Sequence, residues 1–121
     1  MLSFNFYGTS DQSAHCIQVS EQFYEWLIQA DFGLVSRSRP TKIVLDGEEE
    51  ELSLVRLENP TRGILTAYFN ELVLSETGQM LVELDAGVSR EALAPRQYRM
   101  KKLLALLGCV KDSSWQYLQR V

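Results

Sequence analysis

Cysteine and histidine are scarce in this chain, which has two cysteines and one histidine among its 121 residues. Two cysteines are too few for the disulfide framework that stabilises many small secreted domains. We therefore expect Cys16 and Cys109 to be free thiols, packed as small apolar side chains, in the reducing cytoplasm. The first residues also lack the basic and apolar regions of a signal peptide. A zinc site needs about four nitrogen or sulfur ligands, so we predict no metal site and no cofactor.

Long hydrophobic runs and catalytic motifs are missing as well. The longest apolar run, Leu103–Leu107, is far shorter than the roughly 20 residues of a membrane-spanning helix. No glycine-rich phosphate-binding loop and no G-x-S-x-G sequence occurs. His15 and Cys16 are neighbours, but adjacent side chains on an extended chain point apart, which argues against a Cys–His catalytic dyad. The sequence therefore predicts a protein without enzymatic activity and without membrane association.

The chain does contain enough apolar side chains to fold. Hydrophobic residues make up 45% of it and aromatic residues 10%, a composition that excludes general disorder. A length of 121 residues matches one domain with one core. We predict a single globular domain over residues 1–121.

The first third predicts a strand and a helix. Leu2–Gly8 alternates apolar and polar residues, which is typical of a strand, and Thr9–Ala14 is predicted as a polar loop. Ser20 is a suitable N-cap for a helix that runs to about Phe32.

The middle of the chain predicts an antiparallel meander of about four strands over residues 42–86. Turn residues separate its short apolar segments at 46–47, 59–63 and 75–78. Ile64–Leu74 fits a helix by its four-residue spacing, but its flanking turns and β-branched residues favour one arm of a hairpin. We predict the hairpin and keep the helix as the alternative.

The last third predicts helices. Pro95 suits the first position of a helix that ends at Gly108. Its expected buried face consists of Met100, Leu103, Leu104 and Leu107. A last short helix would carry Trp115, Tyr117 and Leu118. The predicted class is α+β: an antiparallel β-meander of about four or five strands, with an N-terminal helix and C-terminal helices packed on one face and the other face left open.

Charge is divided unevenly along the chain. Residues 1–85 carry 14 acidic and 5 basic side chains, a net charge of −9, whereas residues 86–121 carry 2 acidic and 7 basic, a net charge of +5. Helical spacing buries Met100 and turns the basic residues around it outward. We predict a partner-binding surface there, formed by Tyr98, Arg99, Lys101 and Lys102. The alternative is that these cations pair with the acidic body of the same chain.

Two other charged segments are interpreted as structural. Glu48–Glu51 lacks the ligand spacing of a calcium loop and is predicted to be a charged hairpin tip that discourages aggregation. Arg37-Ser-Arg-Pro40 is predicted to be an exposed connection whose cations offset nearby acid, with a binding loop as the alternative.

These observations predict a small non-enzymatic cytoplasmic protein-binding module, such as an adaptor, an assembly factor or an inhibitor. Its partner would be another protein with an acidic patch. One alternative is a nucleic-acid-associated protein that uses Tyr98 and the neighbouring cations, although an acidic protein is repelled by phosphates. The least favoured alternative is an enzyme without a recognisable motif.

Overall fold

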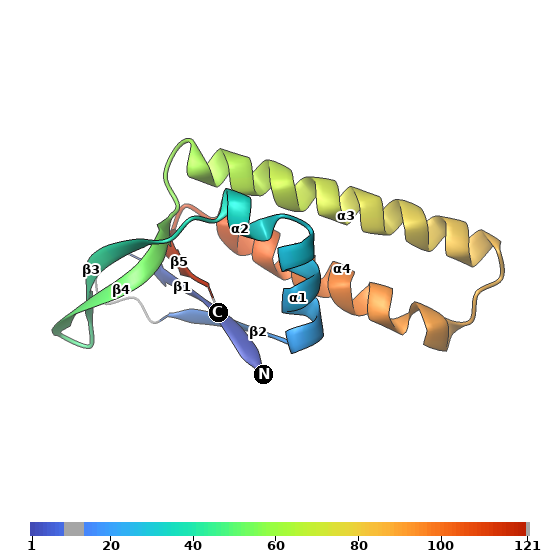
Figure 1. Cartoon of the computed structure of the whole chain (residues 1–121), viewed down its shortest axis with the longest axis horizontal. Coiled ribbons are helices and arrows are strands. Elements are labelled where there is room, and N and C mark those ends of the chain that lie inside the picture. Colours follow the sequence, from blue (N-terminus) through green and yellow to red (C-terminus); the bar gives the residue numbers. More distant parts are fainter. Residues whose placement is uncertain (9–13, 121) are drawn as a thin grey trace.

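The chain is an α+β protein in the computed structural model, which describes residues 1–8 and 14–120. The described part forms a five-stranded antiparallel sheet in the order β2-β1-β5-β4-β3, with helices packed on it (Figure 1). The strands are β1 (Leu2–Gly8), β2 (His15–Val19), β3 (Arg39–Leu45), β4 (Glu48–Arg56) and β5 (Trp115–Gln119). The helices are α1 (Glu21–Gln29), α2 (Phe32–Val35), α3 (Thr61–Asp85) and α4 (Arg90–Lys111). The predicted fold class is thus confirmed, while most of the predicted loop over residues 9–14 lies outside the described residues.

The last strand occupies the centre of the sheet. Leu118 of β5 lies opposite Phe6 of β1 on one side and opposite Val55 of β4 on the other. All three side chains are buried. The prediction of a short helix over Trp115–Leu118 is therefore wrong, because pairing with two distant strands overrides the local pattern.

One continuous helix, α3, replaces the predicted hairpin. Ile64–Leu74, the predicted turn at residues 75–78 and the predicted strand over residues 80–84 all belong to it. Its inner face buries Leu65 and Phe69, which are four residues apart. Thr77, in the middle of the expected turn, donates its hydroxyl to the Val73 carbonyl at 2.7 Å. The helical alternative for Ile64–Leu74 is therefore the correct one.

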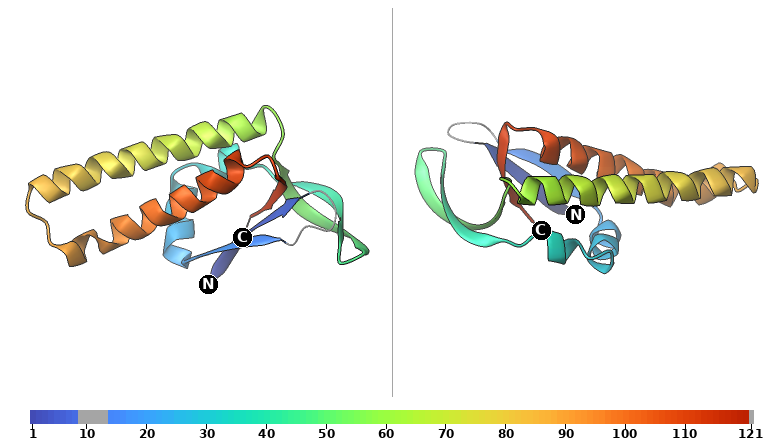
Figure 2. Two further views of the ribbon diagram at one scale, coloured as in Figure 1. Left: turned by 180° about the vertical axis from the view of Figure 1, so that it is seen from behind. Right: turned by 90° about the horizontal axis from the view of Figure 1, so that it is seen from above.

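The second long helix, α4, runs antiparallel beside α3, and both extend beyond the sheet (Figure 2). It begins five residues before Pro95, where the Ser89 side chain accepts a hydrogen bond from the Ala92 amide at 3.3 Å. Pro95 therefore lies inside the helix and not at its start. The helix also continues past the predicted end at Gly108. No helix in the described part is both long and apolar enough to cross a membrane.

The buried face of α4 differs in one position from the predicted face. Leu103 and Leu107 are buried as expected, and Met100 is half-buried. Leu104 is 52% exposed, whereas Leu106 is buried. The face is shifted because α4 is covered both by α3 and by the sheet. At α1 the predicted N-cap is confirmed, since the Ser20 hydroxyl accepts from the Phe23 amide at 3.1 Å.

The core lies between the helices and one face of the sheet. Its largest fully buried side chains include Phe4, Phe6, Phe32 and Phe69. Alternate residues of the same strands point to the other face. That face is polar at its centre, where Tyr7 donates its hydroxyl to Gln119 Oε1 at 2.8 Å.

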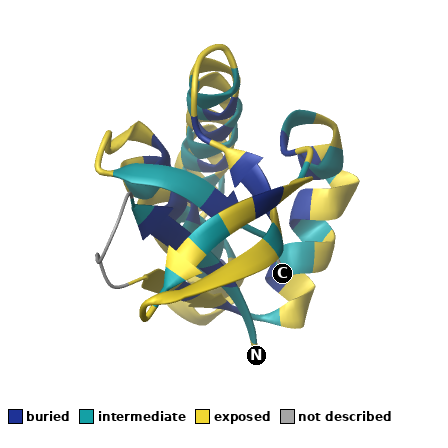
Figure 3. Cartoon of the chain, turned by 90° about the vertical axis from the view of Figure 1, so that its left-hand side faces the viewer, coloured by how far each residue is buried: buried dark blue, intermediate teal, exposed yellow. Residues whose placement is uncertain are grey.

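The β3–β4 hairpin is the exposed end of the sheet (Figure 3). Asp46 and Gly47 both have positive φ angles and form the predicted turn. Glu48–Glu51 belongs to strand β4 and not to the hairpin tip. Arg39 already belongs to β3, so the predicted connection over residues 37–40 is partly strand.

Both cysteines are free thiols, as predicted. Cys109 is half-buried, and burial raises the pKa of its thiol. Cys16 is exposed on β2, so the expectation that it packs as a small apolar side chain is wrong. Its strand has one face toward the core, and Cys16 lies on the other.

Candidate partner-binding site

Tyr98 lies on α4 and faces the beginning of α1. Its hydroxyl accepts a hydrogen bond from the Ser20 backbone amide at 2.9 Å, and its ring meets the Phe23 ring edge-on. The side chain is half-buried and not turned mostly outward as expected. Tyr98 thus has a structural role of its own, which is to connect α4 to the N-cap residue of α1.

Arg96 and Arg99 on α4 bind carboxylates of α3. Glu76 is only 6% exposed, and its carboxylate accepts from Arg96 Nη1 at 2.6 Å and from Arg99 Nε at 3.2 Å. Arg96 also donates to both carboxylate oxygens of Glu83, at 2.8 and 3.2 Å. This hydrogen bonding holds the pKa of Glu83 below its ordinary value. Pairing within the chain therefore accounts for Arg96 and Arg99.

A pocket of about 330 Å³ lies between α1 and the first half of α4. Aromatic side chains form much of its wall, and its lining includes Phe23, Trp26, Pro95, Tyr98 and Arg99. The Arg99 guanidinium lies 5.3 Å from the centre of the Trp26 ring. Because Tyr98 and Arg99 are each held by a second contact, the wall that they form is fixed before any partner binds.

The two lysines of the predicted surface occupy different places. Lys102 Nζ lies 5.6 Å from the centre of the Tyr98 ring, so its charge is next to the pocket. Lys101 is exposed on α4 and does not line the pocket. Neither lysine forms an ion pair with a carboxylate of residues 1–8 or 14–120. The fold thus brings Tyr98, Arg99 and Lys102 together, whereas Lys101 lies beside them on the exposed surface of α4.

Trp26 and Glu76 are the members of this region that sequence reasoning did not connect with α4. The sequence places Trp26 within the first predicted helix and Glu76 within the predicted turn at residues 75–78, and it connects neither with α4. Their contacts depend on how α1 and α3 lie against α4, which no local pattern encodes. The one available signal was the opposite sign of charge in residues 1–85 and 86–121.

Other chemistry is sparse in the described residues. His15 stacks on Trp115 with ring centres 5.9 Å apart, while Cys16 follows it on the opposite face of β2. The two side chains therefore do not converge. Within residues 1–8 and 14–120, no group of three histidine, cysteine, aspartate or glutamate residues could hold a metal ion.

Comparisons of the chain with protein-family models, with curated protein sequences and with solved structures find no significant match.

Proposed function

We propose that this chain is a non-enzymatic module that binds another protein by holding an apolar side chain of an acidic segment in the pocket between α1 and α4. One observation carries the proposal: the pocket has fixed aromatic walls, and Lys102, which has no carboxylate partner in the described part of the chain, places its Nζ 5.6 Å from the ring of Tyr98 in that wall. A concave apolar site with a few polar groups is the usual form of a binding site.

The aromatic wall supplies the anchor of the proposed interface. Phe23, Trp26 and Tyr98 offer large apolar surfaces that are already held in place. Binding energy at protein interfaces is concentrated where an aromatic or aliphatic group fills such a pocket and is screened from water. Little conformational entropy is lost on binding when the walls are rigid.

The lysines supply the preference for acidic partners. Lys102 at the pocket and Lys101 beside it have no carboxylate partner in the described part of the chain. Unpaired cations near an interface accelerate association with an acidic partner and favour it over a basic one.

The same charges give less support to nucleic-acid binding. Arg96 and Arg99, the cations that would grip phosphates most strongly, already bind Glu76 and Glu83. The whole chain has a net charge of −4, which repels a polyanion. The aromatic residues that could stack on bases instead form the wall of the pocket.

The direct test is selection of peptides from a random display library on the immobilised protein. We expect an enriched motif with one large apolar residue next to Asp or Glu. A peptide with that motif should shift the indole N–H resonance of Trp26 and not that of Trp115, which lies outside the pocket. No enrichment, or a motif that shifts only residues far from the pocket, would contradict the proposal.

A double charge reversal tests the role of the lysines. Lys101→Glu with Lys102→Glu should slow association of the selected peptide. The melting temperature should stay nearly unchanged, because neither lysine forms an ion pair with the described residues and such surface substitutions usually change stability by less than about 0.5 kcal/mol. The matched control is Arg90→Glu with Lys111→Glu, which changes the same number of charges at the two ends of α4. Equal effects of the two double variants would mean that net charge, and not this surface, governs binding.

Single-stranded DNA serves as the competing ligand in the same assay. Binding of DNA that falls steeply with salt and is lost in the Lys101/Lys102 variant, with no peptide motif found, would favour the nucleic-acid alternative. The cytoplasm stays the proposed location of the module, and the two free thiols support it.

A further inference from the structure

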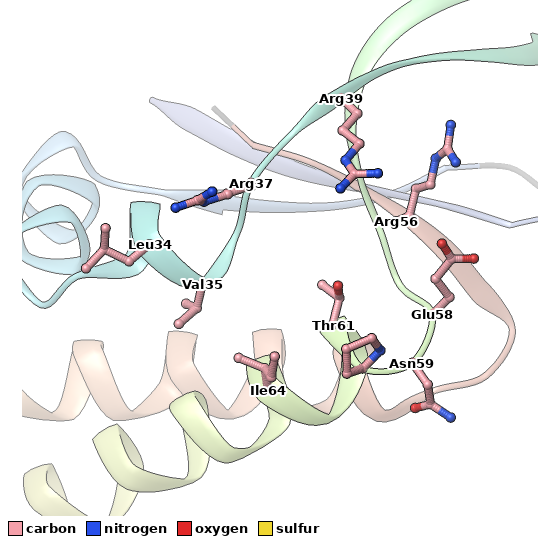
Figure 4. A pocket seen from close by; sticks show the side chains of 10 residues that line it. Leu34, Val35, Arg37, Arg39, Arg56, Glu58, Asn59, Thr61 and Ile64 are labelled. Atoms are coloured by element: carbon pink, nitrogen blue, oxygen red, sulfur yellow. The ribbon is translucent and has the colours of Figure 1, made fainter.

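A second pocket, of about 310 Å³, lies where α2, the base of the β3–β4 hairpin and the beginning of α3 meet. Three arginines line it, Arg37 before β3, Arg39 at the start of β3 and Arg56 at the end of β4 (Figure 4). Arg56 is distant in sequence from Arg37 and Arg39, and the pairing of β3 with β4, with Arg39 opposite Leu54, brings it to the same pocket. Figure 4 shows that Arg39 projects into the space above Thr61, whereas the Arg37 side chain extends toward Leu34 and the Arg56 side chain points away from Thr61.

None of these guanidinium groups has a carboxylate partner within residues 1–8 and 14–120. The ion pairs of this part of the chain involve Arg96, Arg99 and Lys42 instead. Glu58 lines the same pocket, yet it lies beyond ion-pair distance of all three arginines. The three like charges line one pocket. A chain with a net charge of −4 therefore keeps a local excess of positive charge here.

The rest of the lining suits an anion attached to a small organic group. The Thr61 hydroxyl points toward Arg39 (Figure 4). Thr61 is also the first residue of α3, whose N-cap Pro60 provides no side-chain cap, and a helix start adds partial positive charge. On the other side, Leu34, Val35 and Ile64 form an apolar wall, with Leu34 68% and Ile64 49% exposed.

We propose that this arginine pocket binds a phosphate monoester, with the phosphoryl group between Arg37, Arg39 and Arg56 and the organic group against Leu34, Val35 and Ile64. Three guanidinium charges opposed by the single charge of Glu58 leave an excess of about two, which matches a phosphate monoester dianion. Arginine also presents paired N–H donors that fit phosphate oxygens. A phosphodiester or a sulfate ester carries only one charge and fits less well.

The first experiment compares two small esters of nearly the same shape by isothermal titration calorimetry. Phenyl phosphate is a dianion near pH 7.5 and phenyl sulfate is a monoanion. We expect phenyl phosphate to bind one to one and about tenfold more tightly than phenyl sulfate, since the second charge adds one charge-assisted interaction. Equal binding of the two esters, or no saturable binding of phenyl phosphate at millimolar concentration, would overturn the proposal.

Three substitutions assign the binding to this pocket. Arg39→Gln should weaken binding of phenyl phosphate about tenfold or more, and Glu58→Gln should strengthen it by removing the opposing charge. Arg90→Gln removes one positive charge at the start of α4, outside the pocket. It should leave the affinity for phenyl phosphate within about twofold of the wild-type value. All three residues are exposed, so we expect the variants to fold, which circular dichroism checks. Similar losses in Arg39→Gln and Arg90→Gln would show that the ester senses only the overall charge.

A phosphoserine peptide and its unphosphorylated form distinguish two kinds of ligand, phosphorylated protein segments and small phosphate esters. Tighter binding of the phosphopeptide than of phenyl phosphate would assign the pocket to phosphorylated protein segments, and the reverse order would assign it to small phosphate esters. Either result supports the proposal when it depends on Arg39. Binding of the unphosphorylated peptide with the same affinity as the phosphopeptide would contradict it.

Discussion

Arg62 connects three segments of the backbone through one side chain. Its two terminal nitrogens donate to the carbonyl oxygens of Leu57, Val110, Asp112 and Trp115, at distances of 2.6 to 3.0 Å. These carbonyls belong to the end of β4, the end of α4 and the start of β5. One guanidinium thus fixes the place where the helical hairpin joins the sheet.

We predict that Arg62→Gln lowers the free energy of unfolding by about 2–4 kcal/mol, because hydrogen bonds to a charged group are lost and partly buried carbonyls lose their partner. Urea denaturation followed by circular dichroism measures the loss. Arg90→Gln, at an exposed residue, is the control and should change stability by less than about 0.5 kcal/mol. A similar small change in Arg62→Gln would mean that water replaces the guanidinium at no cost.

Two adjacent leucines of α4 give a matched pair of stability variants. Leu103 is fully buried and Leu104 is 52% exposed. Leu103→Ala should cost about 2–5 kcal/mol because it leaves a cavity in the core, whereas Leu104→Ala should cost less than about 1 kcal/mol. Equal losses in thermal or urea denaturation would contradict the packing of α4 described here.

The residue pattern predicted the N-cap of α1 but not the contacts of Tyr98. Ser20 is an N-cap in the structure because the first N–H groups of a helix need a local acceptor, and that need is visible in the sequence. The place of Tyr98 depends on α1, which lies about 70 residues away along the chain. The sequence therefore indicated the basic surface of α4 but not which of its side chains are held within the fold.

At the scale of elements, α3 and α4 form a hairpin that is held together by charge as well as by apolar packing. The pairing of Glu83 with Arg96 gives this hairpin a dependence on pH. The carboxyl group has a lowered pKa in the folded chain, so its contribution to stability is complete above its ordinary pKa of 4.5 and is lost as the pH falls through the lowered value.

We predict that Glu83→Gln reduces the loss of stability that the wild-type chain shows on acidification below pH 4.5. Urea denaturation at a series of pH values measures this slope, and carbon NMR of the carboxyl group measures the pKa of Glu83 directly. Glu71→Gln, at an exposed residue of α3, is the control. A Glu83 pKa at or above its ordinary value would contradict the assigned hydrogen bonds.

The four glutamates of β4 lie on exposed positions of the β3–β4 hairpin. Lys42 Nζ and Glu49 Oε1 are 3.9 Å apart, and both side chains are more than half exposed. We predict that replacing Glu48–Glu51 with serine leaves the fold intact, within about 0.5 kcal/mol per site. A stabilisation of the wild type by calcium or magnesium that disappears in the serine variant would show instead that these carboxylates bind a cation.

The elements that the sequence failed to predict share one cause. Ser75-Glu-Thr-Gly78 has the composition of a turn, yet it is helical because α4 covers this part of α3 and Arg96 and Arg99 bind Glu76. Trp115–Gln119 has no strong local preference, yet it is a strand because β1 and β4 pair with it. In both cases contacts between distant segments outweigh local propensity.

For the molecule as a whole, the division of charge in the sequence has two structural counterparts. Part of the basic excess of residues 86–121 is neutralised by Glu76 and Glu83 across the α3–α4 hairpin. A separate local excess of positive charge lies in the first part of the chain, where Arg37, Arg39 and Arg56 line one pocket. The sequence pattern predicts Arg37 and Arg39 as part of an exposed connection, but Arg56 joins them only through the β3–β4 pairing.

The integrity of the whole sheet depends on β5. Tyr117 lies opposite Tyr7 of β1 and opposite Arg56 of β4. We predict that Tyr117→Pro abolishes cooperative unfolding, because proline interrupts hydrogen bonding in a strand that has a partner on each side. Tyr117→Ala removes the side chain but keeps the backbone donor, and it should still unfold cooperatively. A cooperative melt of Tyr117→Pro would mean that β1 and β4 hold together without β5.

The central place of β5 also sets an order of events during synthesis. A ribosome makes β1 and β4 long before Trp115–Gln119, so two separate hairpins exist for a time with no strand to join them. The strand edges that β5 later covers are then unpaired, and unpaired edges recruit strands of other chains. The nascent chain is therefore most prone to aggregate just before its last described strand is made, and a chaperone that covers these edges would act in that interval.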